Sequence, residues 1–372
     1  MDRRSALKGA GLFAAGALLD GCSSRGAPRA SADRGVPTLK LPKVDVSEER
    51  IIRTTVGLRP FRPPGFRVER ENLGQKIIVH NYGHGGGGLS LSWGSSHLAV
   101  EKLSEDGNAP GKVAVLGCGA LGLSTARLLQ QRGTEVTIYA KDVPPLTTSN
   151  VAAGQWSPFS VAEFRRRTPE FDAQIGQAAR FSYRYFQGLV GSYYGVRWLT
   201  NYVLSDSPFG GSGEAEGIVF PETRDLRPGE HPFPTQHARQ FVTMLIEPHT
   251  YLGALMRDFQ LAGGRVVVRE LRDVDEIRSL PESAIMNCTG LGAKALFDDQ
   301  ELTPVKGQLT FLLPQPEVDY ITLLGDLYMM PRSDGILLGG TFERGEWSLD
   351  VDEEALARIV EGHKKFFTEM RS

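Results

Sequence analysis

Two glycine-rich turns near the start of the chain carry its clearest chemical signal. HNYGHGGGG covers residues 80–88 and VLGCGALG covers residues 115–122, and each turn follows an apolar run typical of a buried strand. Because glycine has no side chain, such turns allow a ligand to approach the backbone closely. The pair raises the question of which ligand needs both turns, and which elements hold them together.

The second turn has the spacing of a dinucleotide-binding fingerprint. Residues 111–142 have the pattern strand, tight turn, helix, strand, with Gly117, Gly119 and Gly122 in a GxGxxG motif. Gly117 permits the sharp turn, Gly119 lets a pyrophosphate approach the backbone, and Gly122 lets the helix pack against the strand. The phosphates would lie at the helix N-terminus, where unpaired N–H groups and the helix dipole favour anions.

Asp142 and two further segments bear on which dinucleotide is bound. Asp142 lies about 20 residues beyond the fingerprint, where an acid would bind the adenosine ribose; the alternative is an ordinary turn residue. Residues 145–159 are rich in small and hydroxylic side chains, and residues 283–296 are another apolar run that enters a glycine-rich turn. Each could be an ordinary loop, but together these strand ends favour FAD over NAD.

The composition is that of a globular chain without a basic, nucleic-acid-binding surface. With 372 residues, of which 41% are hydrophobic, the chain can bury a core and divide into two domains. The net charge is −2, and the basic run at residues 165–167 is typical of a solvated helix face, which argues against nucleic acid as a partner.

The spacing of His80 and His84 alone would suit a metal site, but the residues around them and the cysteine pattern do not. Cys118 and Cys288 fit no disulfide framework or metal-binding pattern, so we expect both to be small buried residues. His80 and His84 flank part of the first turn, but no carboxylate or cysteine is arranged around them. A buried hydrogen-bonding role is therefore favoured for both histidines.

Residues 1–43 are expected to lie outside the fold, as an export signal and tether. Their apolar run, residues 9–19, is too short to span a bilayer. The pair Arg3–Arg4 resembles a twin-arginine signal, which makes the twin-arginine translocase an expected partner. Cys22 follows a segment that resembles a lipoprotein box, although the aspartate before it is atypical, so lipid attachment stays open. Residues 23–43 are typical of a flexible tether, and we expect a periplasmic or cell-envelope protein.

Six segments together resemble signature segments of the D-amino-acid oxidase family of flavoproteins. They are VGLRPFRPPGFRVERE, HNYGHGGGGLSLSWG, GCGALGLSTA, PLTTSNVAAGQW, NCTGLGA and GGTFERGEWS. The resemblance covers about residues 46–372 and implies an α/β fold of two domains. A Rossmann-like FAD-binding domain would take residues 46–158 and 240–302, with 56–59 at the pocket edge. A mainly antiparallel substrate-binding domain would take residues 159–239 and 303–372.

The order of the segments departs from the family, in which those resembling VGLRPFRPP and HNYGHGGGG come last. We interpret the chain as a circular permutant, with the C-terminal part of the family at residues 46–103. Residues 104–110 would join it to the first strand of the family at Lys112. Such rearrangements are tolerated where the chain ends of a fold lie close together.

The resemblance also implies a reaction and its residues. The α-amine of a D-amino acid is oxidised, the imino acid hydrolyses to a 2-oxo acid, and oxygen reoxidises the flavin with release of hydrogen peroxide. Arg59 matches the carboxylate-binding arginine of the family, Tyr328 the tyrosine that hydrogen-bonds the carboxylate, and Gly86 the residue whose carbonyl accepts from the amine. An arginine is the side chain suited to a forked contact with a carboxylate.

Three other positions bear on the lid loop, the substrate preference and the structure of the site. Leu324 stands where eukaryotic members have a second tyrosine in a lid loop, and the loop in this chain is short. Phe342 stands where members that act on acidic substrates carry an arginine, so neutral D-amino acids are favoured. Arg62 is expected to pair structurally within its own motif.

The cofactor contacts implied by the resemblance fall on the glycine-rich turns and the hydroxylic segment. They are Gly117, Gly119, Ala120, Leu121, Gly122, Asp142, Thr147, Thr148, Ser149, Ala153, Gly154, Gln155, Gly85, Gly87, Gly88, Leu89, Ser90, Leu271 and Gly290. Two other functions stay open: a dehydrogenase of the same fold with a different electron acceptor, and an exported flavin-binding protein without activity.

Overall fold

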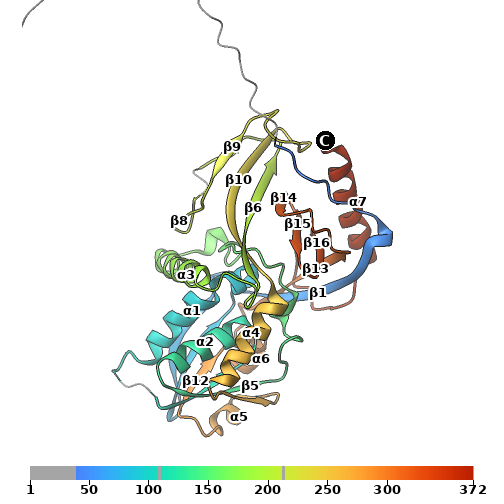
Figure 1. Ribbon diagram of the computed structural model, residues 1–372. Coiled ribbons are helices and arrows are strands. Elements are labelled where there is room, and N and C mark those ends of the chain that lie inside the picture. Colours follow the sequence, from blue (N-terminus) through green and yellow to red (C-terminus); the bar gives the residue numbers. More distant parts are fainter. Residues whose placement is uncertain (1–38, 108–109, 212–213, 372) are drawn as a thin grey trace, which may run out of the picture. The chain divides into compact units, whose positions relative to one another are not determined.

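The computed structural model describes residues 39–107, 110–211 and 214–371, so residues 1–38 of the expected signal and tether, with Cys22, lie outside the described residues. The expectation that the tether extends to residue 43 is wrong, because Leu39 and Leu41 pack on a hydrophobic cluster of the fold. The described chain contains a six-stranded sheet and a nine-stranded sheet (Figure 1). The six-stranded sheet runs in the order β11 (Arg265–Val268), β5 (Glu135–Ala140), β4 (Lys112–Leu116), β12 (Ala284–Asn287), β3 (Lys76–Tyr82) and β2 (Arg67–Leu73). All neighbours are parallel except β2, which is antiparallel to β3.

Helices cover both faces of this sheet, because its central strands are apolar on both sides. In β4, Val113 and Val115 belong to one hydrophobic cluster, and Ala114 and Leu116 belong to another. Strands buried on both faces are typical of parallel sheets. The elements on the first face are α1 (Gly88–Leu103), α2 (Ala120–Gln131), α3 (Pro169–Gln187) and α4 (Pro248–Leu261). The second face carries α5 (Val274–Arg278), and α6 (Gly292–Leu296) follows β12.

The nine-stranded sheet is mainly antiparallel. Its order is β1 (Ile51–Phe61), β13 (Thr303–Leu312), β16 (Gly335–Gly339), β15 (Leu327–Arg332), β14 (Tyr320–Leu324), β6 (Val196–Ser205), β10 (His237–Ile246) and β9 (Arg224–Leu226), with β17 (Glu343–Arg344) paired to β13. The helix α7 (Glu353–Glu369) packs on one face. Figure 1 shows β1, from the start of the described chain, beside strands from its end. The remaining elements are short: β7 (Glu214–Ala215), β8 (Ile218–Val219), η1 (Glu48–Arg50), η2 (Gly85–Gly87), η3 (Thr148–Val151) and η4 (Phe164–Arg166).

Three elements lie elsewhere than the expected domain boundaries place them. The strands β1 and β10 fall largely within the ranges expected for the FAD-binding domain, yet both pair within the nine-stranded sheet. The helix α3 falls within the range expected for the other domain, yet it packs against α1. A Cβ added at Gly94 would lie 1.9 Å from Ala178 O, and Gly94 N donates to Ser182 Oγ at 2.7 Å. A strand or helix does not carry in its own sequence the identity of the partner it packs against.

The first and last described segments of the chain lie together. Val44 and Val46 share a hydrophobic cluster with Phe366 and Phe367 of α7. The Lys43 ammonium group donates to the carbonyl oxygen of Thr368 at 3.4 Å. No helix in the described part of the chain is both long enough and apolar enough to span a bilayer.

Candidate active site

One edge of the six-stranded sheet collects most of the predicted cofactor segments. Parallel strands present their carboxyl ends at the same edge, where α/β proteins bind their ligands. The Gly117 turn follows β4, Asp142 follows β5, Gly290 follows β12, and the glycine run 85–88 follows β3. Leu271 follows β11 at this edge and packs with the hydrophobic cluster beneath α5.

The dinucleotide turn requires glycine at two of its positions. Gly117 has a φ of +98°, and a Cβ added there would lie 2.5 Å from Cys288 O. A Cβ added at Gly122 would lie 2.0 Å from Gly117 O. Side chains at either place would push the turn, the helix and β12 apart. The turn therefore shows the close approach of helix and strand backbone that the fingerprint predicts.

The first turn of α2 lies against Ser149 of the hydroxylic segment. Gly119 at the N-cap supplies no side-chain cap, and Ala120 N donates to Ser149 Oγ at 3.0 Å. A Cβ added at Gly119 would lie 2.9 Å from the same hydroxyl. The structure thus brings the hydroxylic segment onto the helix N-terminus, where backbone N–H groups and the helix dipole suit a pyrophosphate.

The rest of the hydroxylic segment is fixed to its surroundings. Thr147 Oγ1 donates to Asn150 Oδ1 at 2.7 Å, and η3 spans Thr148–Val151. Gly154 has a φ of +109°, and a Cβ there would lie 2.3 Å from Ile246 O. Ala153 packs against the hydrophobic cluster on the inner face of the nine-stranded sheet. This segment therefore lies between the two sheets.

Sequence reasoning missed the residue that holds this segment from the other side. Arg332 Nη1 on β15 donates to Ala152 O at 2.9 Å, and its guanidinium also pairs with Asp334. The Arg332 side chain is only 3% exposed. A buried arginine in a hydrophobic hairpin was a possible signal, but its partner lies 180 residues away.

The glycine run 85–88 leads directly into α1 and is packed closely against its surroundings. Gly86 is exposed, whereas Gly85 and Gly87 are buried, and a Cβ at either would lie 2.5 Å from a neighbouring atom. A Cβ at Gly88 would lie 3.6 Å from Leu121 Cδ2.

The start of α1 continues the contact with the hydroxylic segment. Leu89 is buried, and Ser90 Oγ donates to Gln155 O at 3.3 Å. The glycine run and the dinucleotide turn are neighbours, because α1 packs on α2 and a Cβ at Gly88 would approach Leu121.

Arg59 on β1 and Tyr328 on β15 meet at one face of the nine-stranded sheet. The Nη1 atom of Arg59 is buried and has no hydrogen-bond partner within the described chain. Burial raises the pKa of Tyr328, and the Arg59 guanidinium beside it acts in the opposite direction. A Cβ at Gly86 would lie 4.0 Å from Arg59 Cδ, so the glycine run reaches the same place. An unpaired guanidinium N–H beside a phenol is a donor set suited to a carboxylate.

Phe342 and Leu324 take different positions relative to this pair. Phe342 is 57% exposed, and its ring centroid lies 6.0 Å from Arg59 Cζ. Leu324 lies in the hairpin of β14 and β15, opposite Leu327, and packs with the hydrophobic cluster beneath α7. The loop predicted to be short is therefore the tight turn of the β14–β15 hairpin.

The two histidines of the first turn differ from each other. His80 is hydrogen-bonded as predicted, with Nδ1 2.9 Å from Asn287 Nδ2 and Nε2 3.3 Å from Glu71 Oε2. His84 is buried and stacks on Phe66, but neither ring nitrogen has a partner within the described chain. Burial lowers its pKa to about 3. The expected hydrogen-bonding role is therefore wrong for His84, because an apolar ring fills the space beside it.

Arg62 does pair structurally, but its carboxylate partner lies outside its own motif, and the cysteines are buried as predicted. Arg62 Nε donates to Asp299 Oδ2 at 3.0 Å, and Tyr82 Oη donates to the same oxygen at 2.8 Å. Burial raises the pKa of both Cys118 and Cys288 to about 12, so neither is a reactive thiolate at neutral pH. Asp142 has a half-exposed carboxylate 4.0 Å from Lys141 Nζ.

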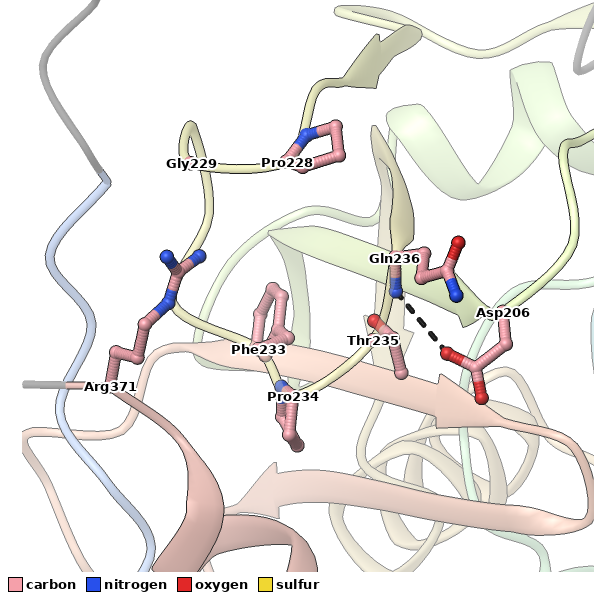
Figure 2. Close-up of a pocket in the computed structure, with 8 residues that line it drawn as sticks. All are labelled: Asp206, Pro228, Gly229, Phe233, Pro234, Thr235, Gln236 and Arg371. Carbon is pink, nitrogen blue, oxygen red and sulfur yellow. Dashed lines mark hydrogen bonds between the residues drawn. The ribbon is translucent and has the colours of Figure 1, made fainter.

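A separate hollow of about 670 Å³ lies between the β9–β10 connection and the C-terminal segment (Figure 2). Its lining includes Phe233, Arg371 and Asp206, whose Oδ1 accepts from Gln236 N at 3.2 Å. None of the predicted site residues lines it. The candidate site is therefore located by the strand ends and by the unpaired Arg59, and this groove is not part of it.

Taken together, the helix N-terminus at Gly119, the glycine run 85–88 and the two sheets define a two-sheet α/β fold of the flavoenzyme type. The solved structure of glycine oxidase from Geobacillus kaustophilus matches with a TM-score of 0.52 at 18% identity, covering 70% of this chain and 80% of that chain. The family model for FAD dependent oxidoreductases (DAO) matches residues 112–372.

Two curated relatives agree with this match. The D-amino-acid oxidase of Rubrobacter xylanophilus is 32% identical over 263 residues, which cover 68% of this chain and 76% of that protein. The D-amino acid oxidase of Dugesia ryukyuensis is 29% identical over 267 residues, with the same two coverages. The chain belongs to the FAD dependent oxidoreductase (DAO) family, its cofactor is FAD, and its activity is of the amino-acid-oxidase type.

Proposed function

We propose that this enzyme oxidises neutral D-amino acids to 2-oxo acids, with release of ammonia and hydrogen peroxide. The observation that carries the proposal is the buried, unpaired Nη1 of Arg59 beside Tyr328. Bound FAD supplies the hydride acceptor, so the protein's own part is to bind and orient the substrate. The D configuration is supported by the names of both relatives, which are D-amino acid oxidases.

Each substrate group has a candidate partner in the chain. The Arg59 fork and the Tyr328 hydroxyl would bind the carboxylate through charge-assisted and neutral hydrogen bonds. The carbonyl of the exposed Gly86, close to Arg59, would accept from the amine. Held at both groups, the substrate keeps its α-carbon in one orientation, which is the main contribution a protein can make to this reaction.

Phe342 supports a neutral side chain on the substrate. Its ring centroid lies 6.0 Å from Arg59 Cζ, and the ring is more than half exposed. A phenyl ring offers no hydrogen bond to a second carboxylate, so burial of an acidic side chain there would be unfavourable.

The test is hydrogen peroxide release from a panel of D-amino acids, with L-alanine and D-aspartate as controls. We expect activity on D-alanine and larger neutral D-amino acids, and less on D-aspartate. Phe342→Arg should shift the preference towards D-aspartate, whereas Phe164→Arg, at another exposed phenylalanine, should not. Best activity on D-aspartate in the unaltered enzyme would contradict the proposed substrate class.

We also propose that the chain is a circular permutant within its family. The family match begins at residue 112, whereas the segment before it supplies β1, β3 and α1. The proximity of Lys43 to Thr368 supports an ancestral connection at that place. A reordered chain, with residues 111–371 first and 39–107 joined behind them by a short glycine–serine linker, should bind FAD and keep full activity. Failure of several linker lengths to restore FAD binding would contradict the permutation.

Export stays a proposal that rests on the sequence. We propose that Arg3–Arg4 direct the folded, FAD-loaded enzyme to the twin-arginine translocase, and that Cys22 can carry a lipid anchor. Replacement of both arginines by lysine should leave the enzyme in the cytoplasmic fraction. Cys22→Ser should move it from the membrane fraction to the soluble envelope fraction, and an unchanged distribution would remove the anchor from the proposal.

A further inference from the structure

Four neighbouring strands of the nine-stranded sheet carry two large polar side chains with two glycines between them. The sheet order is β1, β13, β16 and β15. Arg59 lies on β1 and Tyr328 on β15, whereas Gly307 lies on β13 and Gly339 on β16. To meet, the two polar side chains must therefore cross the two middle strands, and they do so over the two glycines.

The Arg59 guanidinium lies flat against Gly307. A Cβ added at Gly307 would be 2.4 Å from Nη2 and 2.6 Å from both Cζ and Nη1. Three nearly equal distances to atoms of one plane mean that this plane faces the glycine. Because non-bonded carbon atoms prefer a separation of roughly 3.5–4.0 Å, any side chain at 307 would lift the guanidinium by about 1 Å.

The Tyr328 ring lies against Gly339 in the same way. Tyr328 and Gly339 are direct partners across β15 and β16. A Cβ added at Gly339 would be 2.1 Å from Tyr328 Cζ, 2.2 Å from Cε2 and 2.5 Å from the hydroxyl oxygen. The phenol end of the ring, and not only its base, therefore rests on the glycine.

Backbone conformation does not explain either glycine. Both are buried, and neither has the positive φ that would require glycine. Glycine weakens the interior of a strand, and it is expected there where another group approaches the backbone closely. The neighbouring Gly340 differs, since a Cβ there would contact Leu327 Cδ2 at 3.0 Å and Ile359 Cγ1 at 3.1 Å, towards α7.

We propose that Gly307 and Gly339 are positioning residues that set the height and tilt of Arg59 and Tyr328. They leave the unpaired Arg59 Nη1 and the Tyr328 hydroxyl at the level where one carboxylate can bind both. This inference rests on the proposed function of the site, and it adds the two residues that determine its geometry. Neither glycine touches the substrate, so each acts only through the side chain above it.

The test compares Gly307→Ala and Gly339→Ala with Gly340→Ala in the FAD-loaded enzyme. The readouts are KM and kcat for D-alanine, and the dissociation constant of benzoate, a carboxylate without an amine, from the change it causes in flavin absorbance. A displacement of about 1 Å in a binding group can cost on the order of a hundredfold. We expect KM and the benzoate constant to rise about a hundredfold for Gly307→Ala and about tenfold for Gly339→Ala. Flavin content should stay constant, and Gly340→Ala should change neither constant by more than about twofold.

A double-mutant cycle separates positioning from general packing. In an Arg59→Ala background, Gly307→Ala should add less than about twofold, because the group it displaces is gone. Gly339→Ala should likewise add little in a Tyr328→Ala background, and this cycle suffices if Gly307→Ala does not fold. Full additivity would overturn the proposal. A lower flavin content with an unchanged benzoate constant in the enzyme that still holds FAD would also overturn it. If benzoate responds as expected but no D-amino acid reduces the flavin, the proposed function fails and the positioning role stands.

Discussion

At the six-stranded sheet the candidate site consists of backbone, and at the nine-stranded sheet it consists of side chains. The first contributes glycine turns and a helix N-terminus at the ends of adjacent parallel strands. The second contributes Arg59 and Tyr328 from strands that are far apart in the sequence. A binding site made of backbone needs positions without a side chain, since any side chain would fill the site. Side-chain sites depend on what lies beneath each group.

The largest effect is expected at the six-stranded sheet. Gly119→Val should place a branched side chain at the helix N-terminus, beside the Ser149 hydroxyl. Because φ at Gly119 is −81°, a valine is conformationally allowed, and the loss would come from blocked phosphate access. We expect flavin content, measured by absorbance of the purified protein, to fall to about a tenth or less. The matched control is Gly111→Val, where the space around an added Cβ is open. A full flavin spectrum in Gly119→Val would contradict the assigned turn.

The second prediction tests the side chains that the nine-stranded sheet contributes to the site. Arg59→Ala should raise KM by about a hundredfold, roughly 3 kcal/mol, with normal flavin content, because two charge-assisted hydrogen bonds to the carboxylate are lost. Arg59→Lys should rescue only partly, since it keeps the charge and loses the fork. Steady-state peroxide kinetics and flavin absorbance on the same samples separate substrate binding from cofactor binding. A wild-type KM in Arg59→Ala would place the substrate elsewhere.

A third prediction concerns the buried His84, which follows β3 of the six-stranded sheet. Protonation of its side chain is unfavourable in the folded protein. The unfolded chain binds this proton near pH 6.5, whereas the folded protein excludes it down to about pH 3. Unfolding free energy is therefore unaffected above pH 6.5 and falls as the pH drops towards 3. At pH 4.5 the loss should be about 2 to 3 kcal/mol, from about 1.4 kcal/mol per pH unit.

His84→Phe provides the comparison, because it can keep the stacking on Phe66 and cannot be protonated. Urea denaturation between pH 7.5 and about 4.5 should give a flatter pH dependence for this variant than for the unaltered protein. Parallel curves would show that His84 gains a proton acceptor or a partner in the folded state.

The smallest effect is expected at Tyr328. Tyr328→Phe removes one neutral donor and keeps the ring that rests on its strand partner, so KM should rise about tenfold at most, roughly 1 kcal/mol. The flavin spectrum and the temperature of unfolding should not change. A loss as large as that of Arg59→Ala would mean that the hydroxyl, and not the guanidinium, carries most of the carboxylate binding.

The same contrast explains how far the sequence could predict the molecule. The Gly117 turn and its βαβ unit followed from spacing alone, because glycine positions and helix periodicity are local properties. The positions of Arg59 and Tyr328 came only through family resemblance, since no local pattern indicates that β1 pairs with β13 and lies near β15.

Elements whose position depends on distant partners were placed least well. The expected boundaries divided β1 and α3 differently from the sheets they pack on. The unpaired state of His84 depends on the ring of Phe66 against it, which no spacing rule contains. Arg332 was missed for the same reason, because its contact with Ala152 is a long-range one.

The central claim is that bound FAD, Arg59 and Tyr328 act together on one enantiomer of a neutral amino acid. The most direct measurement is the absorbance of the purified, flavin-loaded enzyme mixed with D-alanine or L-alanine in the absence of oxygen. The account predicts that D-alanine bleaches the flavin, that L-alanine leaves it yellow, and that admission of oxygen restores the colour with release of hydrogen peroxide. A flavin that stays oxidised with every neutral D-amino acid, or that L-alanine bleaches equally well, would contradict it.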